Sequence, residues 1–216
     1  MKSLFKPLHV NLGLVLLWSV CFMSCQNRAG NETETEDPNL ITCERIGPVL
    51  KNSTASSLEE TFGSENLSQS TRNVDGEERN ITRVFANQPE EVTILWSKED
   101  PNVVEKLIVM DENGPYHTKE NLRVGISLRD VVRINNFLPV TFSNFYSGVG
   151  GYGQILSFGG GEIEKNYPCL KGQLDIVRLN GIDVNALETF KELDTVQSNH
   201  QLVQNMLIKI TEITLE

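Results

Sequence analysis

The stretch that most constrains the fold runs from Leu122 to Phe137, LRVGISLRDVVRINNF, and continues as a run rich in glycine and aromatic residues to Glu164. This pattern predicts the end of a strand, then a capped helix, then a strongly curved hairpin. A fainter arrangement of the same kind lies at Val49–Trp96. We therefore expect a helix-plus-hairpin unit that occurs twice, in residues 49–96 and 122–164.

Cap residues place a helix near the start of each unit. Thr54 and Ser127 are candidate N-caps, because a side-chain hydroxyl can accept a hydrogen bond from a free N–H of the first turn. Gly63 and Asn136 are candidate stops, since both residue types tolerate the left-handed conformation. Ser127 and Asn136 each lie 73 positions after Thr54 and Gly63, but at this offset the two units have almost no identical residues. The similarity between the units is therefore one of structural roles.

Segments with strand-like composition account for much of the remaining chain. They are Ile81–Ala86, Val92–Trp96, Val103–Met110, Gln173–Leu179 and Met206–Leu215. Asn113-Gly114 predicts a tight hairpin turn with positive φ angles. We expect about eight strands and two or three short helices. The predicted fold class is α+β with β dominant, built on antiparallel sheet within a single globular domain over residues 41–216.

The N-terminal segment has the pattern of an export leader. An apolar run, Leu12–Met23, follows Lys2 and Lys6 and is shorter than the ~20 residues that a membrane span needs. It ends in Met23-Ser24-Cys25, where a small residue precedes a cysteine. This ending resembles the lipobox of bacterial lipoproteins, although Phe22 stands where that pattern prefers Leu. The resemblance implies a signal peptide over residues 1–24 and lipid on Cys25. The alternative is an ordinary cleaved signal peptide.

Charge and composition restrict the partners of the mature chain. Residues 25–40 are polar and acidic and contain no aromatic side chain, so we expect a flexible tether there. Without residues 1–24 the chain keeps 17 basic and 29 acidic side chains. This balance argues against nucleic acid and against electrostatic docking on anionic lipid. We expect membrane attachment through the N-terminal lipid, in the bacterial cell envelope at the outer membrane or the periplasmic face.

Two cysteines remain in the folded part, Cys43 and Cys169. In an oxidising compartment an isolated pair is more often a disulfide than a catalytic site, so we expect a bridge between them. With His117 and His200 the pair would supply four zinc ligands by number, but the spacings match no known zinc motif. We expect neither a metal nor a cofactor.

The run from Phe142 to Phe158 contains the candidate ligand-binding residues, Phe145, Tyr146 and Tyr152. Exposed rings on a glycine-rich hairpin can stack on sugars or contact a partner protein. The same rings can instead fill the core beneath the hairpin. The sequence contains no nucleophile elbow, phosphate loop or kinase motif, and it therefore provides no candidate catalytic residue.

The folded part resembles small envelope lipoprotein domains of the BamE/SmpA type, in which a Gly and a Ser/Thr introduce a short capped helix before a hairpin. Gly125, Ser127 and Leu128 carry this resemblance, and Asn136 stands where that family has Gly. The chain is longer and richer in β structure than the family. We expect a non-enzymatic binding or accessory protein whose partner is another envelope protein. The alternatives are glycan or small-ligand binding through residues 142–158, and a hydrolase or hydrolase inhibitor.

Overall fold

The computed structural model describes residues 37–74, 76–147, 151–181 and 183–216, and the part from Asp37 to Glu216 forms one compact unit. The predicted leader, Cys25 and the tether up to residue 36 lie outside the described residues. The helices are α1 (Ala55–Phe62), α2 (Leu128–Ile134), α3 (Glu162–Asn166) and α4 (Val184–Lys191), with the 3₁₀ turns η1 (Ser64–Asn66) and η2 (Val203–Asn205).

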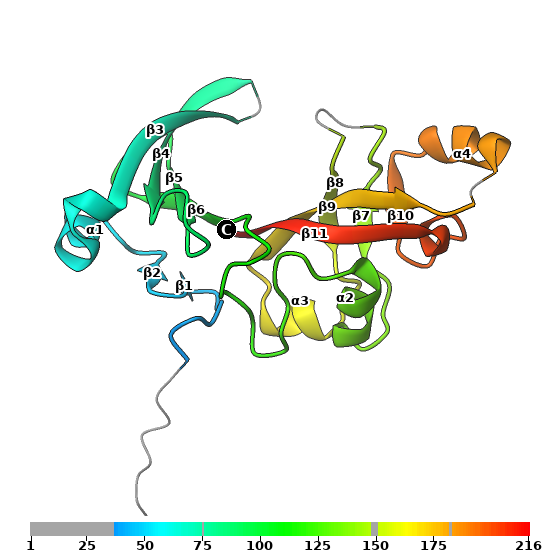
Figure 1. Ribbon diagram of the computed structural model, residues 1–216, viewed down its shortest axis with the longest axis horizontal. Helices are drawn as coiled ribbons and strands as arrows, with labels where there is room; N and C mark the ends of the chain where they lie inside the picture. Colours follow the sequence, from blue (N-terminus) through cyan, green and yellow to red (C-terminus); the bar gives the residue numbers. More distant parts are fainter. Residues whose placement is uncertain (1–36, 75, 148–150, 182) are drawn as a thin grey trace, which may run out of the picture. The chain divides into compact units, whose positions relative to one another are not determined.

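The strands form two antiparallel sheets (Figure 1). The small sheet pairs β1 (Arg45–Ile46) with β2 (Val49–Leu50). The strands of the large sheet are β3 (Leu67–Val74), β4 (Glu77–Val84), β5 (Val92–Trp96), β6 (Val104–Val109), β7 (Thr141–Ser143), β8 (Gly153–Ser157), β9 (Leu170–Leu179), β10 (Thr195–Gln197) and β11 (Met206–Leu215). Their order is β10-β7-β8-β9-β11-β6-β5-β4-β3. The prediction of a β-dominant α+β fold is confirmed.

One face of the large sheet carries the hydrophobic core. Ile94, Leu107 and Ile210 of three neighbouring strands are fully buried there and belong to one cluster with Val131 of α2 and Ile163 of α3. Figure 1 shows α2 and α3 together on one side of β11, with the ends of the β3–β4 and β7–β8 hairpins on the other side. Helices α2 and α3 therefore cover one face of the sheet, and no helix of the described residues covers the central part of the other face.

The predicted helix caps are confirmed. Thr54 and Ser57 form a reciprocal capping box at the start of α1, and the Ser127 hydroxyl accepts a hydrogen bond from the Asp130 N–H at 3.1 Å at the start of α2. Gly63 and Asn136 both end their helices with positive φ angles, 78° and 57°, although the ψ angle of 147° places Gly63 outside the left-handed helical conformation. Helix α1 precedes the β3–β4–β5 meander, and α2 precedes the β7–β8 hairpin. The interpretation of these two units as a repeat stays a prediction.

The hairpin turn predicted at Asn113-Gly114 is wrong, because neither residue has a positive φ angle. Asp111 forms this turn instead: its carboxylate accepts from the Asn113 N–H at 2.8 Å and its carbonyl from the Gly114 N–H at 3.1 Å. The chain then continues as a loop to α2 rather than returning as a strand. A side-chain hydrogen bond of Asp thus satisfies the turn without left-handed residues.

Asn135, directly after α2, connects three parts of the chain through its buried side chain. Its amide nitrogen donates to the carbonyls of Leu138 at 3.1 Å and Phe158 at 2.5 Å. Its amide oxygen accepts from the Ile163 N–H at 3.2 Å. A Cβ atom on Gly161 would lie 2.2 Å from the Asn135 side chain, so glycine is needed for this close approach. Asn135 therefore fixes the end of β8 and the start of α3 against α2.

Replacement of Asn135 by alanine should destabilise the fold strongly. It leaves the buried Ile163 N–H without a partner and removes one donor each from the Leu138 and Phe158 carbonyls, of which the second keeps the Gly161 N–H at 3.1 Å. We expect a loss of about 2–3 kcal/mol in the free energy of unfolding. Urea denaturation followed by circular dichroism measures it. The matched control is Asn136→Gly, which keeps the left-handed stop and should change the free energy by less than about 1 kcal/mol. Equal effects of the two substitutions would show that the Asn135 hydrogen bonds do not stabilise this junction.

Candidate functional site

A cleft of about 970 Å³ lies over the uncovered face of the large sheet. Strands β6, β9 and β11 provide its floor. The end of the β3–β4 hairpin lines one side through Arg72 and Asn73, and β8 lines another through Gln154 and Leu156. In the sheet order these two hairpins lie on either side of β11, and in Figure 1 both extend to the side of β11 opposite α2 and α3. The cleft is thus bounded by elements from both halves of the chain.

A bulge in β11 determines which side chains face the cleft. The pairing of β11 with β9 shifts between Ile210 and Glu212, so that Thr211 is the extra residue. Ile210 and Ile213 both lie in the core although they are three positions apart, and Glu212 lies on the cleft side. Gly172 of β9 permits the bulge, because a Cβ atom there would lie 2.7 Å from the Glu212 carbonyl oxygen.

Two ion pairs neutralise most of the charged side chains in the cleft, and Lys171 is the lining cation that forms no ion pair among the described residues. Glu212 is only 7% exposed; its carboxylate lies 3.3 Å from the guanidinium of Arg72 and accepts from the Thr214 hydroxyl at 3.0 Å. Lys106 pairs with the Glu216 side chain at 2.7 Å. A buried carboxylate is costly unless it is paired and hydrogen-bonded. Arg72 therefore connects the β3–β4 hairpin to the floor of the cleft.

Glu164 fixes the β8 side of the cleft. One oxygen of its carboxylate accepts hydrogen bonds from the Ser157 hydroxyl at 2.9 Å, the Phe158 N–H at 2.9 Å and the Gly160 N–H at 3.1 Å. The Gly160 N–H and the Ser157 hydroxyl lower the pKa of Glu164, since both stabilise its charged form. The carboxylate is therefore ionised at neutral pH and holds the end of β8 against α3.

The chemistry of the lining restricts what the cleft can hold. It combines amides (Asn73, Gln154, Gln173), ion pairs and apolar side chains such as Leu95 and Ile108, and it contains no aromatic ring. In the part of the chain that the structure describes, no group of three or more His, Cys, Asp or Glu side chains could hold a metal ion. Amide, ionic and aliphatic groups together match the groups of a polypeptide chain, whereas sugar binding commonly uses ring stacking.

The three aromatic residues predicted to bind a ligand lie in different environments, and none lines the cleft. Phe145 is 3% exposed and packs on Phe142 at a centroid distance of 5.4 Å. Tyr146 is 42% exposed; it meets Phe190 edge to face and has the Lys191 ammonium 5.4 Å from its ring. Tyr152 is 45% exposed. Ligand binding by these residues stays a prediction, with Tyr146 and Tyr152 as its two accessible members.

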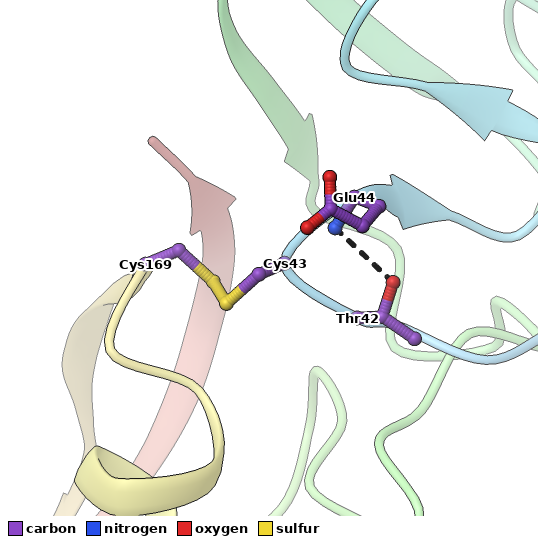
Figure 2. Close-up of a disulfide and its surroundings, with 4 residues drawn as sticks. All are labelled: Thr42, Cys43, Glu44 and Cys169. Atoms are coloured by element: carbon purple, nitrogen blue, oxygen red, sulfur yellow. Dashed lines mark hydrogen bonds between the residues drawn. A yellow bond between two sulfur atoms is a disulfide. The ribbon is translucent and has the colours of Figure 1, made fainter.

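The disulfide between Cys43 and Cys169 is present, with a Cα–Cα distance of 5.6 Å (Figure 2). It joins the segment before β1 to the residue that precedes β9. Cys25, the predicted site of lipid attachment, lies outside the described residues. Among the described residues, no helix is long and apolar enough to cross a membrane.

The sequence analysis did not identify the residues of the cleft. Glu212 and Arg72 belong to no motif, and they are 140 positions apart. One signal was available in the strand Met206–Leu215: its alternation of apolar and polar residues breaks between Ile210 and Ile213. Such a break within a strand indicates a bulge, and bulges often re-aim functional side chains.

Comparisons with known proteins identify no family. No protein-family model matches the chain, and no curated protein matches it. Among solved structures, the chain is similar to the uncharacterized protein yfeY from Escherichia coli, with a TM-score of 0.46 and 11% sequence identity, over 82% of this chain and 98% of that chain. This similarity carries no functional argument, so function is argued from the residues of this chain alone.

Loss of the disulfide should destabilise the protein substantially. The bridge joins residues 126 positions apart, and a cross-link over so long a loop restricts the unfolded chain strongly. We expect the Cys43→Ser/Cys169→Ser variant to lose about 2–5 kcal/mol in the free energy of unfolding. Urea titration of the oxidised protein, the reduced protein and this variant measures the change. The reduced protein should match the variant, and identical midpoints for all three would contradict the prediction.

Proposed function

We propose that this protein is a lipid-anchored, non-enzymatic binding protein of the bacterial envelope, and that its cleft holds an extended segment of another envelope protein. The observation that carries the proposal is the composition of the cleft: four of its charged side chains form two ion pairs, its uncharged polar groups are mostly amides, and its lining contains no aromatic ring. A polypeptide offers complementary carbonyl, N–H and aliphatic groups to such a surface.

Two features support the location outside the cytosol. The Cys43–Cys169 disulfide is typical of oxidising compartments. The apolar leader that ends at Cys25 is the second feature, since lipid on this cysteine would attach the chain to a membrane. The acidic segment after Cys25 is then the tether from which the folded part reaches its partner.

Arg72 has a specific role in this proposal. It lies on the β3–β4 hairpin, is partly exposed, and pairs with the nearly buried Glu212 on the floor. A partner segment in the cleft would lie against this pair and remove it further from water, which strengthens its Coulomb attraction. The pair thus keeps the hairpin in place over the cleft before the partner binds.

Photocrosslinking in cells tests the proposed partner. A benzoylphenylalanine in place of Gln154 or Gln173, both of which line the cleft, should give a discrete covalent adduct with one envelope protein. The control is the same residue in place of Glu60, which is exposed on α1 and does not line the cleft. Adducts of equal yield at all three positions, or none at the cleft positions, would reject a protein partner there.

The glycan alternative is tested in the same cells. If cell-wall fragments raise the melting temperature of the protein while the cleft positions give no protein adduct, binding is to glycan instead. Replacement of Tyr146 and Tyr152 by leucine should then abolish the thermal shift, because stacking needs the rings.

Metabolic labelling with radioactive palmitate tests the anchor. We expect label on the intact protein and its complete loss in the Cys25→Ala variant, which should also move from the membrane fraction to the soluble fraction after cleavage of the leader. A Cys21→Ala variant is the matched control, since it removes a neighbouring cysteine of the leader and should keep the label. Label that survives Cys25→Ala would refute acylation at this residue.

A further inference from the structure

A second cavity, of about 380 Å³, shares no lining residue with the cleft. Helix α2 and the segment after it form one side, and the end of β9, η2 and the start of β11 form the others. Its volume lies within the range of about 300–1,000 Å³ that small-molecule sites occupy. None of the aromatic residues predicted to bind a ligand lies here.

Aliphatic side chains form one part of the walls of this cavity, and polar residues, among them Asn180, Asn199 and Gln204, form the rest. Leu128 and Val132 come from α2, Val203 from η2, and Met206 and Ile208 from β11. Four of these side chains, all except Val132, are almost completely buried, so the cavity wall is the outer surface of the core itself. A ligand that covers this wall must bring apolar surface of its own, because removal of apolar area from water is what stabilises such contact.

The charge of this cavity is opposite to that of the whole chain. The protein has 29 acidic and 19 basic residues, yet the lining contains Arg129 and Arg178 and no Asp or Glu. Within the described part of the chain, neither arginine has an acidic partner within ion-pair distance, whereas Arg72, Arg79, Arg83 and Arg133 all do. Two arginines from different elements thus line one cavity that contains no acidic side chain.

Phe137 forms part of the rim in a conformation that its side chain disfavours. It has a φ angle of 62° and is 74% exposed, and the Val132 carbonyl accepts from its N–H at 2.8 Å. A bulky residue in the left-handed region is strained, and such residues occur disproportionately at binding sites. Asn135 and the left-handed Asn136 immediately before it hold the chain in this path. The ring is therefore presented at the cavity entrance rather than folded into the core.

We propose that this cavity binds a single-chain amphiphile with an anionic head group, a carboxylate or a phosphate. The head group lies between Arg129 and Arg178, where guanidinium groups donate charge-assisted hydrogen bonds to its oxygens. The acyl chain covers the aliphatic wall formed by Val132, Val203 and Met206, and Phe137 shields it from water at the rim. This site is independent of the cleft, so either proposal can fail without the other.

Photoaffinity labelling of membranes that contain the full chain tests this proposal. The probe is dodecanoate with a diazirine at the end of its chain, and labelled peptides are identified by mass spectrometry. We expect saturable labelling of peptides that contain residues 127–139 or 198–208. Excess dodecanoate or dodecyl phosphate should compete, and the stronger competitor identifies the head group. Dodecanol should compete about tenfold less well, since it lacks the charge that the arginines bind.

Substitutions at the arginines complete the test. Arg129→Gln with Arg178→Gln should reduce labelling by about tenfold or more, while circular dichroism and the melting temperature stay unchanged because both side chains are exposed. The matched control is Arg133→Gln, an arginine of the same helix that pairs with Asp130 and does not line the cavity. Equal competition by dodecanol, competition by inorganic phosphate alone, labelling elsewhere in the chain, or equal loss in the control would each overturn the proposal.

Discussion

The pairing of β11 with β9 on one side and β6 on the other is the interaction on which the rest of the structure depends. In the large sheet, the strands from β3 to β6 and the strands from β7 to β10 meet through β11 alone. This strand is formed by residues 206–215, close to the C-terminal end of the chain. The two helix-containing halves therefore become one sheet when β11 inserts between them. The β11–β6 pairing joins segments far apart in the sequence, and its loop-closure entropy makes it the slower of the two pairings to form.

The disulfide strengthens the same junction from the other end of the chain. Cys169 directly precedes β9, and its carbonyl accepts from the Glu216 N–H at 3.0 Å, immediately after β11. Cys43 lies in the segment that precedes β1, where Ile41 is buried and donates to the His117 carbonyl at 2.7 Å. Cys169 thus links three segments: the one that contains Cys43 through the disulfide, β9 as its neighbour in sequence, and Glu216 through a backbone hydrogen bond.

Helix caps and most strands could be predicted from neighbouring residues, whereas contacts between distant segments could not. Thr54, Ser127 and Asn136 were predicted correctly because caps and left-handed stops depend on adjacent residues alone. Strands β5 and β11 were predicted with their observed limits, since both are dense in β-branched and aliphatic residues. Strand β3 was missed, because an edge strand with few buried positions has polar composition. The disulfide between Cys43 and Cys169 was predicted because they are the two cysteines of the folded part and an oxidising compartment was expected. The ion pair of Glu212 and Arg72 depends on the pairing of distant strands, which no local sequence pattern encodes.

The two cavities differ in whether their basic side chains have acidic partners, and this difference predicts different ligands for them. In the cleft, Arg72 and Lys106 are already neutralised by carboxylates of the floor. Apart from Lys171, the groups that a ligand would meet there are paired charges, amides and aliphatic side chains. In the cavity beside α2, Arg129 and Arg178 have no carboxylate beside them. Because an acidic chain could supply such partners easily, their exclusion from this lining favours an anion from outside. This difference is why we propose a polypeptide for the cleft and an anionic amphiphile for the cavity beside α2.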